Sequence, residues 1–109
     1  MLNQVVIVGR LTADPEVINT ESGKKKTTVC VAIPRSYKNP EGIYESDFIR
    51  CILWNGVASS TSEYCHKGDI VGVKGRLQSS SYEKDGEVKY ATDVIAEKVT
   101  FLSSKKADE

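Results

Sequence analysis

The sequence lacks the residues and motifs that most enzymes and metal sites require. Its 109 residues include one histidine and three cysteines. Cys30, Cys51 and Cys65 form no C-x-x-C pair, and no cysteine and histidine stand at metal-ligand spacing. There is no GxxxxGK[ST] phosphate loop, no HExxH motif and no partner set that would activate a serine or cysteine nucleophile. We therefore predict a protein that is not an enzyme and that holds no metal or cofactor.

Two further features are missing, a membrane segment and an excess of charge. No apolar run is long enough to cross a bilayer, and residues 1–10 lack the basic start and small-residue cleavage site of a signal peptide. We therefore expect a cytoplasmic protein without a membrane partner. Fifteen Lys and Arg balance 15 Asp and Glu. This balance argues against binding to nucleic acid by bulk charge alone, but it does not exclude binding, because the distribution of charge decides the local field.

The most informative stretch is Asp47–Trp54, DFIRCILW, which alternates as a β-strand does. One face is purely apolar and belongs in a core: Ile49, Cys51 and Leu53. The other face, called the ring face below, consists of Phe48, Arg50, Ile52 and Trp54. If it is exposed, nucleic-acid bases can stack on its rings while the cation takes a phosphate. The alternative is a strand buried between two apolar layers, and most Phe and Trp side chains are core residues.

Alternation and turn residues divide the rest of the chain into short elements. They predict strands over 5–8, 27–37, 44–54, 69–77 and 88–102, a short strand over 16–19, a break near 97–98, and a helix over 57–66 that Lys67–Gly68 stops. Without the 16–19 piece, three strands, a helix and two strands follow each other. This is the order of the all-β OB fold, a five-stranded Greek-key barrel with one short helix between strands 3 and 4. We predict one domain over 1–102 and a short flexible tail over 103–109.

Four stretches in register resemble the bacterial single-stranded DNA-binding protein family. They are NQVVIVGRLTADPEV, with the family's Gly-x-Leu-x-x-Asp-Pro-Glu turn, ESDFIRCILWNGVA, SEYCHKGDIVGVKGRL and DGEVKYATDVIAE. The resemblance implies a homo-oligomer, usually a tetramer, of OB domains that binds single-stranded DNA without strong sequence preference. It implies roles in DNA replication, recombination and repair and an association with the nucleoid. It also favours the exposed interpretation of the ring face. It also implies that the first strand, around Asn3–Val8, builds the oligomer.

The resemblance further implies which residues meet DNA. The family's stacking places hold Tyr37, Phe48, Trp54 and Tyr82. Phosphate contacts are expected from Arg10, Arg35, Lys38, Arg50, Lys74 and Arg76. Two alternatives stay open here: Arg50 could instead pair with a neighbouring carboxylate, and Lys74 and Arg76 could simply be solvated. Whether the lysines at 24–26 touch DNA also stays open.

The sequence departs from the family in two places. Residues 78–81, where the family often carries a basic run, are Gln-Ser-Ser-Ser, which predicts a shallower salt dependence of binding. The family's acidic, apolar-tipped tail has no counterpart before Glu109. We therefore expect a short form, either a natural paralogue of a plasmid, phage or DNA-uptake system or a trimmed chain, without tail-mediated protein recruitment. The alternative function is an OB-fold replication accessory that acts as a protein–protein adaptor, and single-stranded RNA is not excluded as a ligand.

Overall fold

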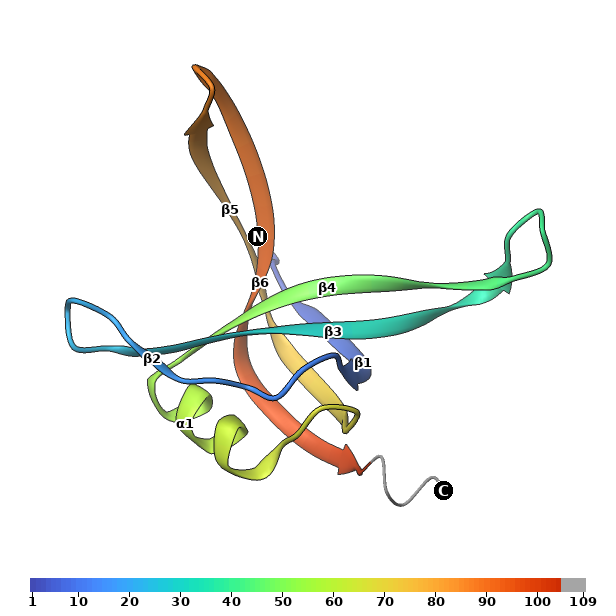
Figure 1. Cartoon of the computed structure of the whole chain (residues 1–109), viewed down its shortest axis with the longest axis horizontal. Coiled ribbons are helices and arrows are strands. Elements are labelled where there is room, and N and C mark those ends of the chain that lie inside the picture. Colours follow the sequence, from blue (N-terminus) through green and yellow to red (C-terminus); the bar gives the residue numbers. More distant parts are fainter. Residues whose placement is uncertain (105–109) are drawn as a thin grey trace.

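The computed structural model describes residues 1–104 and contains one sheet and one helix (Figure 1). The elements are β1 (Val5–Leu11), β2 (Ile18–Asn19), β3 (Lys25–Lys38), β4 (Tyr44–Trp54), α1 (Asn55–Tyr64), β5 (Ile70–Lys84) and β6 (Glu87–Ser103). The strand order is β1-β5-β6-β4-β3-β2, and β1 also pairs with β3, which closes a barrel. Apart from the two-residue β2, α1 lies between the third and fourth strands. The predicted OB fold is therefore confirmed.

Strand β1 runs further than the sequence predicts, because Gly9 continues it and does not end it. β1 pairs with β5 from Val5 to Arg10 and turns onto β3 at Arg10 and Leu11. At Gly9, β1 and β3 approach so closely that a Cβ on residue 9 would overlap the carbonyl oxygen of Ala32. The glycine is thus the residue that lets β1 close the barrel against β3.

The predicted break near 97–98 is a β-bulge within a continuous β6. Lys74 opposes Lys98 and Gly75 opposes Ala96, so Glu97 is the extra residue between them. A Cβ on Gly75 would overlap the carbonyl oxygen of Ile95, so only glycine fits opposite the bulge. The bulge bends the β5–β6 ladder, and such a bend is what a closing barrel needs.

Two hairpins extend beyond the barrel as two-stranded arms, one formed by β3 and β4 and the other by β5 and β6 (Figure 1). The β5–β6 arm ends at Asp85–Gly86, whose φ angles are 53° and 78°. Two successive positive φ angles are typical of the tight hairpin turn that Asp-Gly favours. The turn is therefore of the type that its sequence favours, and residues 77–90 of this arm are exposed.

The core lies inside the barrel and under α1. Its fully buried side chains include Val31, Leu53, Val71, Val73 and Val94. Burial of a side chain of this kind contributes about 1.5–3 kcal/mol. α1 covers one end of the barrel through Ala58 and Thr61, both buried.

The predicted bounds of the helix are wrong by two residues at each end. α1 begins at Asn55 and ends at Tyr64, and Lys67–Gly68 belongs to a separate turn. In that turn the amide of Asp69 donates to the carbonyl of His66 at 3.0 Å, and Gly68 has a φ of 90°. β6 includes Ser103, the first residue of the predicted tail, and residues 105–109 lie outside the described residues. Across 1–104 no helix is long and apolar enough to span a bilayer.

Candidate nucleic-acid interface

The two faces of β4 differ in exposure as the sequence predicts. On the inner face Cys51 and Leu53 are fully buried and Ile49 is half-buried. On the ring face Phe48 is 65% exposed. Arg50 is also exposed, whereas Ile52 and Trp54 are half-buried. The prediction that the ring face is not a second core layer is confirmed.

Strand pairing extends the ring face onto β6 and β5. Residues that oppose each other in a ladder share a face of the sheet. Ile52 opposes Ile95 on β6, which in turn opposes Arg76 on β5. Alternation along these strands adds Asp93 on β6 and Gln78, Ser80 and Tyr82 on β5. Tyr82 is 51% exposed and lies out on the β5–β6 arm, about 20 Å from Arg76 at a strand's rise per residue.

On its other side the ring face continues onto β3. Phe48 opposes Ala32, Arg50 opposes Cys30 and Trp54 opposes Lys26. The small Ala32 leaves the ring of Phe48 open. The Nζ of Lys26 lies 5.4 Å from the centroid of the Trp54 ring, within the range of a cation–π contact. Sequence reasoning left the role of Lys26 open, because the three lysines at 24–26 also suit a solvated hairpin tip.

Arg50 forms a two-pronged ion pair with Asp93, the carboxylate that sequence reasoning missed. Nε of Arg50 donates to Oδ1 of Asp93 at 3.0 Å, and Nη2 donates to Oδ2 at 3.2 Å. Asp93 is 8% exposed, whereas the Arg50 side chain is 60% exposed. The alternative that Arg50 pairs with a carboxylate is therefore what the structure contains. Strand alternation was the available signal, because it places Asp93 on the face opposite to the inward Val94.

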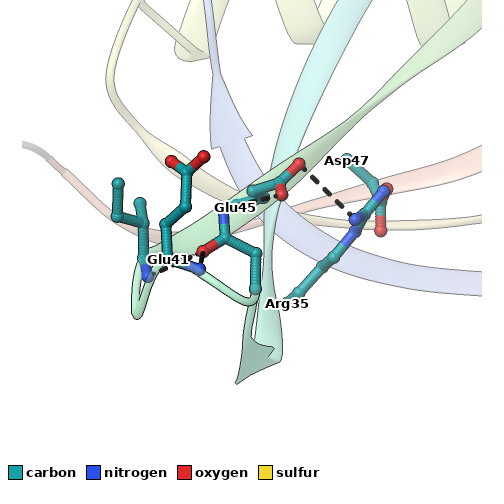
Figure 2. A network of polar contacts seen from close by, with 6 residues as sticks. Arg35, Glu41, Glu45 and Asp47 are labelled. Atoms are coloured by element: carbon teal, nitrogen blue, oxygen red, sulfur yellow. Dashed lines mark hydrogen bonds and ion pairs between the residues drawn. The ribbon is translucent and has the colours of Figure 1, made fainter.

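Arg35 is held by carboxylates as well, on the opposite face of the β3–β4 arm (Figure 2). Its Nε and Nη2 donate to Oδ1 of Asp47 at 3.1 and 2.8 Å, and Nη1 lies 3.6 Å from Oε2 of Glu45. Asp47 neighbours Phe48 along β4 and so points to the other side of the sheet. The hydrogen bond from Arg35 lowers the pKa of Asp47, and the same bond raises the pKa of Arg35.

The far end of the β3–β4 arm places Lys38 and Tyr37 differently. The register shifts between Pro34 and Lys38, after which Lys38 opposes Tyr44. The Nζ of Lys38 lies 5.6 Å from the ring centroid of Tyr44, a residue that shares the parity of Phe48 and was not singled out from the sequence. Tyr37 is 62% exposed, and alternation turns it to the side opposite Lys38. Tyr37 is thus accessible, but pairing does not bring it onto the ring face.

The remaining predicted cations lie along the barrel. Nη1 of Arg10 donates to the carbonyl of Gly68 at 2.9 Å. Lys74 opposes both Val6 and Lys98, and Arg76 opposes Ile95 next to the ring face. Both side chains are exposed, and neither forms an ion pair with any residue in 1–104. They are therefore the predicted cations of the barrel whose charge is not cancelled by a carboxylate contact.

No group of three or more His, Cys, Asp or Glu side chains that could hold a metal ion gathers within residues 1–104. The three cysteines are free thiols, and burial raises the pKa of Cys51 to about 11. Burial also raises the pKa of Cys65.

Comparison with known proteins places this barrel in a family. A sequence model described as the single-strand binding protein family matches residues 2–102. The chain belongs to the single-strand binding protein family. The chain is 44% identical over 110 residues to single-stranded DNA-binding protein B of Bacillus subtilis strain 168, which covers all of this chain and 97% of that protein.

Other relatives in the single-strand binding protein family are longer than this chain. Single-stranded DNA-binding protein 3 of Listeria innocua is 44% identical over 107 residues, which cover 97% of this chain and 67% of that protein. Single-stranded DNA-binding protein 1 of Staphylococcus aureus strain MSSA476 is 41% identical over 110 residues, which cover 70% of its length. The shared part of these proteins is the barrel described above.

Proposed function

We propose that this protein binds and protects single-stranded DNA without sequence preference in DNA replication, recombination or repair. The observation that carries the proposal is the ring face, an exposed surface of aromatic and cationic side chains on a barrel of the single-strand binding protein family. The names of the relatives, which are single-stranded DNA-binding proteins, support the same ligand. They favour DNA binding over the protein–protein adaptor.

Binding combines stacking with phosphate contacts and needs no chemical step, so the protein acts as a binding protein and not as an enzyme. Bases stack on Phe48 and Trp54 on the barrel and on the exposed rings of the arms, Tyr37 and Tyr82. Each stacked base is worth about 1–3 kcal/mol. Phosphates meet the unpaired Lys74 and Arg76 first. Arg10, Arg35, Lys38 and Arg50 complete the set, and the DNA-binding domain comprises residues 1–102.

The oligomer is proposed to be a tetramer assembled through β1, in the cytoplasm. β1 pairs with β3 only at Arg10 and Leu11, and Gly9 lies close to Ala32 of β3, so residues 5–8 have β5 as their one paired strand within 1–104. The outward side chains of this stretch include Val6 and Val8, both exposed. An unpaired strand edge next to exposed valines is suited to pairing with a second copy of the chain.

The fluorescence of Trp54 tests the function directly, because it is the only tryptophan of the chain. Titration with oligo-dT is expected to quench this fluorescence, and the affinity is expected to fall as salt is added. Absence of both quenching and oligonucleotide retention would contradict the proposal and favour the adaptor. Competition with oligo-rU measures the preference for DNA over RNA, and double-stranded DNA is the control that is expected not to compete.

A further inference from the structure

The centre of the ring face holds an arginine whose charge is already cancelled. Arg50 lies between Phe48 and Ile52 on the outward side of β4, and both of its bonded nitrogens face the two oxygens of Asp93. A bidentate pair of this kind neutralises the guanidinium and fixes the direction of its planar fork. A phosphate that approached Arg50 would have to compete with a carboxylate that is already bound.

Asp93 is held within the sheet beside Arg50. It is 8% exposed, and it lies on β6 with Gln78 opposite it on β5. Its neighbour Val94 is buried and opposes Cys51 of β4, which locks the register of β6 beside Arg50. The Arg50 side chain, in contrast, is 60% exposed, while its Nε and Nη2 donate to Asp93.

A flat, neutralised guanidinium suits a base better than a phosphate. Arginine planes stack on nucleic-acid bases, and residues two apart along a strand stand about 6.6 Å apart. A DNA strand that follows β4 with one base on Phe48 therefore brings a neighbouring base over Arg50. Arg76, on the same face but without a carboxylate contact in 1–104, remains available to the phosphates.

We propose that Asp93 is a positioning residue that converts Arg50 from a phosphate ligand into a planar stacking group of the ring face. The proposal rests on the proposed DNA binding and replaces the phosphate role of Arg50 within it. The salt dependence of binding distinguishes a phosphate ligand from a stacking group, because each phosphate contact to single-stranded DNA adds about 0.7 to the slope of log K against log salt. A neutralised Arg50 adds nothing to that slope.

The test measures this slope by Trp54 quenching with oligo-dT for four variants. Asp93→Asn frees the charge of Arg50 and is expected to steepen the slope by about 0.7. The double variant Arg50→Gln/Asp93→Asn is expected to keep the wild-type slope and to bind about two- to fivefold more weakly at every salt concentration, the size of an exposed Arg–π contact. Arg76→Gln is the matched control and is expected to lower the slope by about 0.7. Arg50→Lys keeps the charge but not the plane, so it is expected to bind as weakly as the double variant.

Three results would overturn the proposal: a double variant with a slope about 0.7 lower than wild type, an Asp93→Asn variant with an unchanged slope, or full affinity in Arg50→Lys. Thermal unfolding of each variant shows that the barrel is intact, and the double variant leaves no buried carboxylate unpaired. Failure of the wild-type protein to bind oligo-dT would instead refute the proposed function. The two failures are thus distinguishable.

Discussion

At the scale of single residues, exposure separates the side chains proposed to bind DNA from those that hold the barrel together. Phe48 and Leu53 are five residues apart on β4, yet Phe48 is 65% exposed and Leu53 is fully buried. Strand alternation alone produces this difference. The same two residues therefore give a matched pair of variants with opposite expected phenotypes.

Phe48→Ala is expected to weaken oligo-dT binding by about 1–3 kcal/mol, the value of one stacked base, with little change in the unfolding midpoint. Leu53→Ala leaves a cavity and is expected to destabilise the fold by about 2–5 kcal/mol. Fluorescence titration and urea unfolding measure the two effects. An unfolded Phe48→Ala would restore the interpretation of the ring face as core.

The buried thiol of Cys51 makes stability depend on alkaline pH. Burial raises its pKa from an ordinary value of 9.0 to about 11. A raised pKa means that the unfolded chain releases this proton first, so the stabilisation is complete below pH 9 and is lost as the pH rises towards 11. Urea unfolding at pH 8 and pH 10 measures this loss for the wild type and for Cys51→Ala. The free energy of unfolding is expected to fall more from pH 8 to pH 10 in the wild type than in the variant. Equal losses in both proteins would contradict this assignment.

At the scale of elements, the sequence predicts the strands well and their ends poorly. Alternation identifies which residues of β4 face inward because the period of two depends only on the local chain. The end of β1 was placed too early, and the irregularity near 97–98 was predicted as a break and not as a bulge. Both depend on contacts that barrel closure creates, between Gly9 and β3 and between Gly75 and β6. Asp93 was missed and the role of Lys26 was left open for the same reason, since the importance of both residues comes from their partners on β4.

The ion pair of Arg35 with Asp47 joins β3 and β4 at the base of their arm and is expected to fail in acid. Its hydrogen bond lowers the pKa of Asp47. The stabilisation is therefore present above the ordinary pKa of an aspartate, about 4, and is lost as the pH falls through the lowered value. Asp47→Asn is expected to be less stable than wild type at pH 7, with the difference shrinking below about pH 4. Ser46→Ala, on the opposite face of the arm, is the control. A difference that persists unchanged at pH 2 would contradict the pairing.

At the scale of the whole molecule, the electrostatic footprint is smaller than the number of basic residues indicates. The 15 Lys and Arg are balanced by 15 acids, and both Arg35 and Arg50 are paired with carboxylates. Residues 78–81 add no cation between Arg76 and Tyr82. Binding is therefore expected to rely on stacking more than on counterion release.

Introducing cations into residues 78–81 tests whether binding relies on stacking more than on counterion release. Gln78 and Ser80 share the outward face of Arg76 and Tyr82, so Gln78→Arg/Ser80→Arg is expected to steepen the salt slope by about 0.7 for each new phosphate contact. Ser79→Arg/Ser81→Arg places the same charges on the opposite face and is expected to change the slope less. Equal slopes for the two double variants would mean that DNA does not follow the outward face of β5.

Assembly of the whole molecule is expected to depend on the edge of β1. Val6 and Val8 are exposed, and their stretch of β1 pairs with β5 alone within the described chain. Val6→Lys/Val8→Lys introduces like charges at the proposed interface between copies and is expected to convert the proposed tetramer into smaller species. Val88→Lys is the matched control, because Val88 is similarly exposed but lies on the β5–β6 arm. Light scattering measures the mass of each species. If the double variant remains a tetramer, the subunits join through another surface, and if the wild type is a monomer, the ring face binds DNA one chain at a time.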